Sequence, residues 1–113
     1  MSNLPLLDEE IVGTLREVMG EDFSLLIDTY IRDSCERIKA LSQSIESGDA
    51  DEVRRCAHSF KGSSSNIGAV RLADACRLLE AQALSGDHAF WLSRLSLIET
   101  EFAAVRQLLE SSN

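Results

Sequence analysis

Apolar residues recur with a helical period along almost the whole of this 113-residue sequence, and glycines rather than prolines separate the periodic segments. The single proline stands at position 5, so the residue that most strongly breaks helices is confined to the N-terminus. No run alternates polar and apolar residues, which is the pattern of a half-buried strand. The sequence therefore predicts an all-α protein.

Five helical segments follow from the apolar spacing and from the residues that suit helix ends. Asp49 and Glu52 have the spacing of a capping pair at the start of the third segment. Four of the segments are long and amphipathic, and the connections are short, which favours antiparallel neighbours. We expect an up-and-down four-helix bundle with a short additional N-terminal helix laid across it. The expected helices span about residues 8–19, 22–47, 49–65, 70–85 and 88–110.

Length and charge narrow the class of protein. The chain is long enough for one core, so residues 1–113 are expected to form a single domain. Eleven basic against nineteen acidic residues give a net charge of −8, which argues against binding to nucleic acid or to an anionic membrane. No stretch approaches the ~20 apolar residues of a membrane helix, and the N-terminus lacks a signal-peptide pattern. A cytoplasmic location is expected.

Basic residues gather in one part of this acidic chain. Residues 53–79 carry a local charge of +4, while the remainder carries −12. Such a cationic island is expected to attract an acidic protein surface or a phosphoryl group. Its basic members are Arg54, Arg55, Lys61, Arg71 and Arg77, and its one acidic member is Asp74.

His58 lies within this island and has an unusual set of neighbours. At about 100° per residue, it falls nearly opposite Phe60, so it points to solvent if the Phe60 side is buried. Gly62 costs ~1 kcal/mol relative to alanine inside a helix, which favours a functional reason for it. A glycine one turn from the imidazole bares the backbone and lets another protein approach. The residues on the histidine side of the helix are Arg54, Lys61, Gly62 and Ser65.

Several roles for this histidine compete. It is an ordinary exposed polar residue if its neighbours have no function. A metal site is weakly supported, because the two histidines are thirty residues apart and Lys61 would repel a cation. A hydrolase triad is no better supported, because no acidic residue lies three or four positions away. The three cysteines fit neither a disulfide framework nor a zinc site, and we interpret them as reduced thiols at apolar helical positions.

Phosphoryl transfer through the imidazole fits the neighbours better. An exposed imidazole is largely neutral at pH 7, so one ring nitrogen offers a lone pair for attack on phosphorus. Lys61 would stabilise negative charge on the phosphoryl oxygens. The sequence has neither a Walker-type loop nor a kinase glycine-rich loop, so the phosphoryl group is expected to arrive from another protein. Whether such a phosphocarrier counts as an enzyme stays open, but it has no ATP-dependent kinase activity of its own.

These residues carry a resemblance to a known family. The segments AHSFKGSS at 57–64 and NIGA at 66–69, followed by Leu72, Ala73, Leu79 and Glu80, resemble the signature of histidine-containing phosphotransfer (HPt) domains. HPt domains belong to multistep two-component phosphorelays, and their helical bundle agrees with the expected helices over essentially the whole chain. The compact chain without fused domains resembles free-standing bacterial members.

The resemblance implies roles for four residues. His58 would be the phosphoaccepting histidine, Lys61 would contact the phosphoryl group, and Gly62 would admit the partner. Glu80 occupies the position where some members place a glutamine close to the histidine. A glutamate there would orient the imidazole by a hydrogen bond but would repel phosphate, so both effects remain open for Glu80.

The resemblance also implies the partners. The receiver domains of a hybrid sensor kinase and of a response regulator would dock over His58 and exchange phosphate reversibly through an aspartyl phosphate. Mg²⁺ would belong to the receiver, so no intrinsic cofactor or metal is expected, and a monomer is favoured. The class-distinct alternative is a non-catalytic helical adaptor that binds an acidic partner. The expected contact residues are Arg54, Arg55, Ser65, Arg71, Arg77, Leu7 and Ile11.

Overall fold

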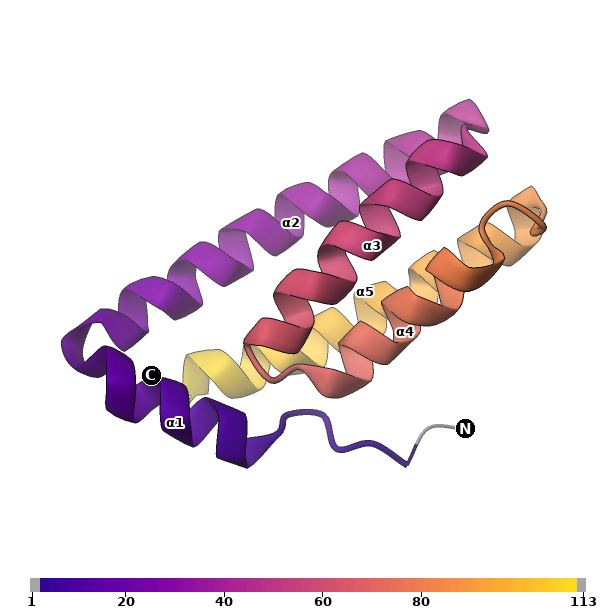
Figure 1. The fold of residues 1–113 in the computed structure, drawn as a ribbon. Helices are drawn as coiled ribbons and strands as arrows, with labels where there is room; N and C mark the ends of the chain where they lie inside the picture. Colours follow the sequence, from indigo (N-terminus) through magenta and orange to yellow (C-terminus); the bar gives the residue numbers. More distant parts are fainter. Residues whose placement is uncertain (1–2, 112–113) are drawn as a thin grey trace.

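The computed structural model describes residues 3–111 and contains only helices, turns and loops over that range (Figure 1). Four long helices form an antiparallel up-and-down bundle, as predicted. A shorter helix and a 3₁₀ turn precede them. The elements are α1 (Glu9–Met19), η1 (Gly20–Asp22), α2 (Phe23–Ser47), α3 (Ala50–Asn66), α4 (Val70–Gln82) and α5 (His88–Ser111).

Helix α3 packs between α2 and α4, and α5 closes the ring by packing against the same two helices (Figure 1). The apolar faces of all four meet in one core. Phe60 of α3 is fully buried there and meets Phe102 of α5 edge to face, with 6.3 Å between ring centroids. Because α3 packs against α2 on one side and α4 on the other, with the core behind it, only one face of α3 points outward. We call the border of this face along α2 the α2 flank and its border along α4 the α4 flank.

Local contacts fix both ends of α3. The Asp49 side chain accepts a hydrogen bond from the Glu52 backbone N–H at 3.1 Å and caps the helix, as its spacing predicted. At the other end Gly68 has a φ of +87°, a conformation that glycine adopts without strain. Within the helix the buried Ser64 hydroxyl lies 2.8 Å from the Tyr30 hydroxyl of α2. Burial raises the pKa of Tyr30 to about 12.

Helix α4 ends at Gln82, three residues before the predicted end at 85. The indole N–H of Trp91 donates to the Ala83 carbonyl at 3.0 Å, so α5 binds the backbone where α4 would otherwise continue. Phe90 lies so close to Gly86 that an added Cβ would be 2.5 Å from the ring. The aromatic residues of α5 therefore hold the connection in a turn. Apolar spacing within α4 does not reveal this long-range contact.

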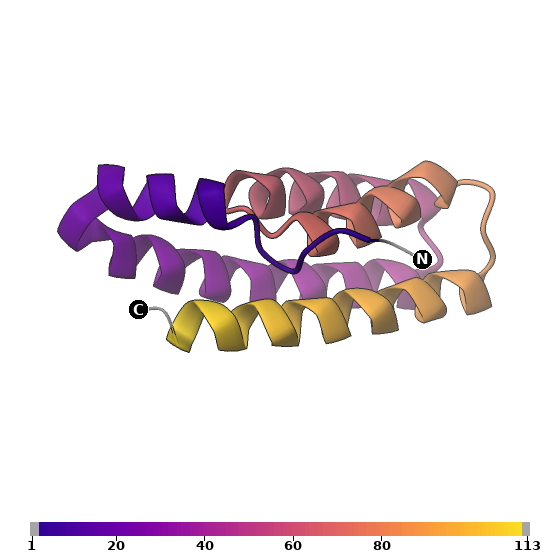
Figure 2. The same ribbon diagram turned by 90° about the horizontal axis from the view of Figure 1, so that it is seen from below.

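Helix α1 folds back along the first turns of α2 rather than crossing the bundle. Figure 2 shows it in the same layer as α3 and α4, beyond the loop that joins them. The Asp8 N–H donates to the Gly68 carbonyl at 2.8 Å, and Ile11 lies against Gly68. Leu7 is 6% exposed and belongs to the core, so the expectation that it is an exposed partner contact is wrong. The first helix thus anchors the end of α3.

Candidate functional site

His58 lies on the outer face of α3 and its side chain is 65% exposed. Phe60, Val53 and Ala57 are fully buried, so the predicted division between a histidine face and an apolar face is confirmed. The division arises because residues two positions apart lie about 200° apart around a helix. The same residues that anchor α3 in the core therefore hold the imidazole in solvent.

Glu80 of α4 contacts both His58 and Lys61. Its Oε2 lies 2.7 Å from His58 Nδ1, and its Oε1 lies 2.7 Å from Lys61 Nζ. The Glu80 side chain is only 20% exposed, and Lys61 is 32% exposed. The orienting contact suggested for Glu80 is therefore present in the structure, with Lys61 bound to the other oxygen of the same carboxylate.

The charge of this carboxylate determines how the imidazole is oriented. The Lys61 ammonium above all, and then the hydrogen bond with His58, hold the pKa of Glu80 below its ordinary value, although burial acts in the opposite direction. An ionised carboxylate only accepts hydrogen bonds, so His58 Nδ1 carries the hydrogen and donates it. In the neutral ring this leaves the Nε2 lone pair directed away from Glu80.

Gly62 is exposed one turn from His58, and a Cβ added to it would meet no atom within 4 Å. Its φ is not positive, so neither crowding nor backbone conformation requires glycine here. Ser65 is also exposed and follows another turn along. The backbone beside the imidazole is therefore bare, and the structure of the chain itself gives no reason for that.

The α2 flank carries a basic residue that the sequence analysis missed. A guanidinium N–H of Arg37 on α2 donates to the hydroxyl of Ser59, the residue after His58. Helical spacing within α3 cannot reveal a residue on another helix. In the sequence, Arg37 is one polar residue beside the apolar stripe of α2, and nothing there indicates that it is half-buried or that it reaches α3.

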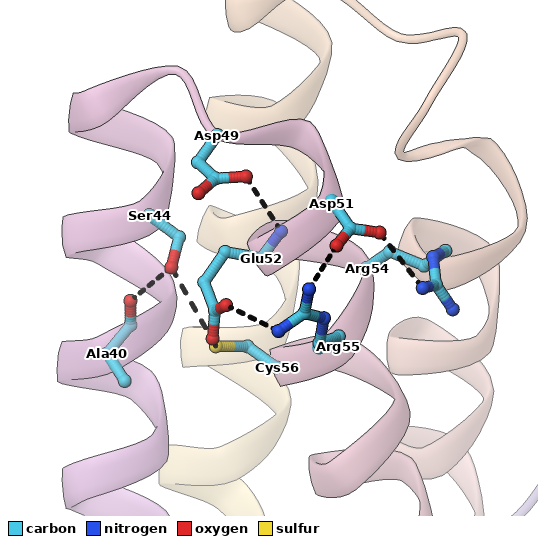
Figure 3. A network of polar contacts seen from close by, with 8 residues as sticks. All are labelled: Ala40, Ser44, Asp49, Asp51, Glu52, Arg54, Arg55 and Cys56. Carbon is cyan, nitrogen blue, oxygen red and sulfur yellow. Dashed lines mark hydrogen bonds and ion pairs between the residues drawn. The ribbon is translucent and has the colours of Figure 1, made fainter.

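The expected cationic island is largely neutralised. Arg54 and Arg55 both bind Asp51, and Arg55 also contacts Glu52 (Figure 3). The hydrogen bond from Arg54, followed by that from Arg55, holds the pKa of Asp51 below its ordinary value. Counting the flanking acidic residues lowers the local charge from +4 over residues 53–79 to +1 over residues 51–80. The expectation of a strongly basic patch is therefore wrong, because its carboxylate partners stand just outside the window that suggested it.

The remaining predicted contact residues do not share one surface. Arg77 is exposed and pairs with Asp74 within α4. Arg71 lies about 180° from Glu80 around α4, so it faces away from His58. It binds the Leu4 carbonyl at 3.1 Å and lies 3.8 Å from the Glu101 carboxylate of α5. The structure therefore does not bring Arg71 to the histidine face.

An apolar pocket lies on the α2 flank toward the end of α3. It has a volume of about 300 Å³ and is formed where α1, α2 and α3 meet. Ile11 is half-buried against Gly68 instead of lining it. Three helices contribute to the pocket, so no single periodic segment predicts it. Its lining includes Leu15, Leu26, Tyr30, Arg37, Asn66 and Ile67.

Comparison with known proteins identifies the family. The sequence model described as "Hpt domain" matches residues 25–108, which is most of the chain. The chain belongs to the Hpt domain family. The crystal structure of histidine-containing phosphotransfer protein B (HptB) from Pseudomonas aeruginosa is similar, with a TM-score of 0.91 and 41% identity over 97% of this chain and 96% of that one.

Two plant proteins extend the comparison. Histidine-containing phosphotransfer protein 4 from Arabidopsis thaliana is 29% identical over 90% of this chain and 80% of its own length. A maize histidine-containing phosphotransfer protein shares the fold, with a TM-score of 0.85 and 21% identity over 95% of this chain and 88% of that one. This Hpt protein is thus a histidine phosphotransfer protein of a phosphorelay, a class that exchanges phosphoryl groups with kinases and receiver domains.

The structure also bears on metal binding, on the cysteines and on membrane insertion of this Hpt protein. Among residues 3–111, no three His, Cys, Asp or Glu side chains are grouped so that they would hold a metal ion. Cys76 is buried, and burial raises its pKa to about 12. Burial also raises the pKa of the half-buried Cys56, whereas Cys35 is exposed, contrary to the expectation of three apolar positions. None of the described helices has the length and apolarity needed to span a membrane.

Proposed function

We propose that His58 is the phosphoacceptor and that it carries a phosphoryl group reversibly between the receiver domain of a hybrid sensor kinase and that of a response regulator. The observation that carries the proposal is the contact of Nδ1 with Glu80, which leaves the Nε2 lone pair of an exposed ring available. His88, the other histidine, is also exposed at the start of α5, but no carboxylate contacts it within residues 3–111. Only His58 is oriented in this way.

The transfer step follows from this arrangement. As Nε2 of His58 attacks the aspartyl phosphate of a receiver, the N–P bond forms, the acyl phosphate P–O bond breaks, and the receiver carboxylate leaves with the electron pair. The imidazole gains positive charge because Nδ1 keeps its hydrogen. Glu80 faces that nitrogen at 2.7 Å and stabilises the developing charge. The same carboxylate thus sets the tautomer and favours the transition state.

Lys61 is proposed to contact the phosphoryl group. Its ammonium rests on Glu80 in the unphosphorylated protein and lies one turn from the imidazole. A phosphoryl group on Nε2 offers it further anionic oxygens, so Lys61 would turn from the carboxylate toward them. We propose that the chain acts as a monomer, that Mg²⁺ is supplied by the receiver, and that this protein contributes no metal ligand of its own.

The docking face is proposed to be the exposed side of α3 together with the apolar pocket on its α2 flank. Gly62 lies on the helix between His58 and the pocket end, so a partner would approach the backbone there without meeting a side chain. Leu15 and Leu26 would replace Leu7 and Ile11 as the apolar contacts. Two of the predicted basic contacts, Arg54 and Arg55, precede His58 by about one turn on α3, although both already bind Asp51.

Phosphotransfer from a labelled receiver tests the proposal. The protein is incubated with a receiver domain phosphorylated on aspartate, and acid-labile label on this chain is measured. We expect label on the wild-type protein and on His88→Gln, and none on His58→Gln. Label that persists in His58→Gln, or its absence from the wild type with every cognate receiver, would contradict the assignment of His58.

A further inference from the structure

Arg37 differs from the other basic residues near His58. Among residues 3–111, Arg54, Arg55, Lys61 and Arg77 each pair with a carboxylate, and Arg37 pairs with none. Its recorded partner is the neutral hydroxyl of Ser59. Its Nε is buried and has no hydrogen-bond partner in the described part of the chain. The guanidinium is therefore not paired with a carboxylate within residues 3–111, and one of its nitrogens, the buried Nε, has no partner.

Two carboxylates line pockets together with Arg37 but do not pair with it. Asp33 lies one turn earlier on α2 and lines the same apolar pocket, but its ion pair is with Arg32 at 3.9 Å. Glu52 of α3 lines a second, smaller pocket with Arg37 and is bound to Arg55 at 3.5 Å. Neither acidic residue is within ion-pair distance of the guanidinium in the structure.

Arg37 is also placed where a docked protein would cover it. It lines both the apolar pocket of about 300 Å³ and the second pocket of about 230 Å³, which also includes Ser59 and Cys56. Both pockets open along the groove between α2 and α3. A partner centred on His58 would reach this groove beside the exposed imidazole. Docking would remove water from the guanidinium and strengthen any charge contact that it makes.

Building on the proposed function, we propose that Arg37 binds a carboxylate side chain of the docking receiver domain and so selects the partner. A half-buried guanidinium that is not paired with a carboxylate suits the carboxylate of a partner, because the planar guanidinium matches carboxylate geometry. Ser59 lies about 100° around α3 from His58, on the side away from Lys61. Arg37 is therefore a recognition residue, and the phosphoryl group belongs to the opposite flank.

Transfer kinetics at varied receiver concentration test this role. The variants are Arg37→Gln, Arg37→Lys and the control Lys39→Gln, which removes the same charge from an exposed position of the same helix. We expect Arg37→Gln to raise KM about tenfold, with kcat within about twofold, and to weaken the dependence of KM on salt. Arg37→Lys is expected to be intermediate, and Lys39→Gln to match the wild type.

The outcomes separate this inference from the proposed function. If wild-type His58 is labelled but Arg37→Gln leaves KM and its salt dependence unchanged, the carboxylate contact is wrong and the phosphoacceptor assignment stands. Equal losses in Arg37→Gln and Arg37→Lys with unchanged salt dependence would show a purely structural role. Faster hydrolysis of isolated phosphorylated Arg37→Gln would place Arg37 at the phosphoryl group instead. Each of these three results overturns the inference.

Discussion

The two flanks of His58 differ in how their charges are used. On the α4 flank, the carboxylate of Glu80 lies 2.7 Å from His58 and 2.7 Å from Lys61, and it is mostly buried. On the α2 flank, Arg37 donates to a hydroxyl and, among the described residues, has no carboxylate partner; it lies beside an apolar pocket. A flank closed on itself suits the orientation of a reacting group, and a flank left open suits the recognition of another molecule.

Both flanks arise from the same topology. The contact of His58 with Glu80 and that of Arg37 with Ser59 each join residues 22 positions apart. The Arg37–Ser59 contact joins the antiparallel helices α2 and α3, and the His58–Glu80 contact joins the antiparallel helices α3 and α4. Each contact lies at a similar distance along the helices from the loop that connects its pair. The two flanks differ in residue type, and the α2 flank also has the apolar pocket to which α1 contributes. Single substitutions can test the charged residues of each flank without changing the bundle.

Gly62 lies between the flanks, and its substitution is expected to have the largest effect. Gly62→Glu should lower phosphotransfer at least about a hundredfold, because a long charged side chain would stand in the docking face. Gly62→Ala should stabilise the fold by ~1 kcal/mol and slow transfer less. Chemical denaturation and transfer assays measure the two effects.

Gly13→Ala provides the matched control for Gly62→Ala. Gly13 also lies in a helix with no atom within 4 Å of an added Cβ, so it should give a similar stabilisation with no loss of transfer. If Gly62→Glu transfers phosphate at the wild-type rate while it remains helical, Gly62 does not govern access.

Lys61→Ala tests the α4 flank next. We expect transfer to fall between about ten- and a hundredfold, because a cation near the developing charge is lost. KM should change little, in contrast to Arg37→Gln, because the α2 flank is intact. Circular dichroism should report unchanged helicity, since Lys61 lies at the surface of the bundle. A rise in KM with unchanged kcat would instead assign Lys61 to docking.

Glu80→Ala is expected to slow transfer about tenfold, because the imidazole loses the group that orients it. Nitrogen-15 NMR of the ring should show the Nδ1–H tautomer in the wild type and a mixture in Glu80→Ala. Glu80→Gln keeps an acceptor oxygen and should lie nearer the wild type in both measurements. An unchanged tautomer ratio in Glu80→Ala would show that the contact does not hold the ring.

The smallest expected effect is the pH dependence of stability that Glu80 confers on the α4 flank. The folded state depresses the pKa of Glu80 below its ordinary value of 4.5. The resulting stability is therefore present above that value and is lost as pH falls below it, through the folded-state pKa. The free energy of unfolding of the wild type should exceed that of Glu80→Gln at neutral pH, and the difference should shrink by about pH 3. Urea denaturation at the two pH values measures it, and a difference independent of pH would contradict the coupling.

Much of the fold is predictable because it depends on local signals. Apolar spacing and cap residues gave the helix limits closely, and the opposition of His58 and Phe60 required only the helical period. The end of α4 was missed because Trp91 of α5 binds the Ala83 carbonyl. Leu7 was expected at the surface because it precedes the first helix, where no helical spacing indicates which side chains enter the core.

The candidate site shows the same limit. Gly62 and Lys61 share a helix with His58, so spacing alone brings them together. The family resemblance pointed to Glu80, but nothing in the sequence showed that its second oxygen binds Lys61. Arg37 lies on another helix, and only packing brings it to Ser59. The basic island failed as a prediction because a window of sequence does not identify the carboxylates that pair with each cation.

With His58 as the proposed phosphoacceptor, the carboxylate beside it would also affect how firmly the phosphoryl group is held. Glu80 lies within hydrogen-bond reach of the His58 ring, and its negative charge would repel a phosphoryl dianion on that ring. Repulsion in the product raises its free energy and so preserves the transfer potential of the bound group. A relay intermediate that formed a very stable phosphohistidine would retain its cargo. Under the proposed function, Glu80 would both orient the ring for attack and keep the phosphoryl group easy to transfer.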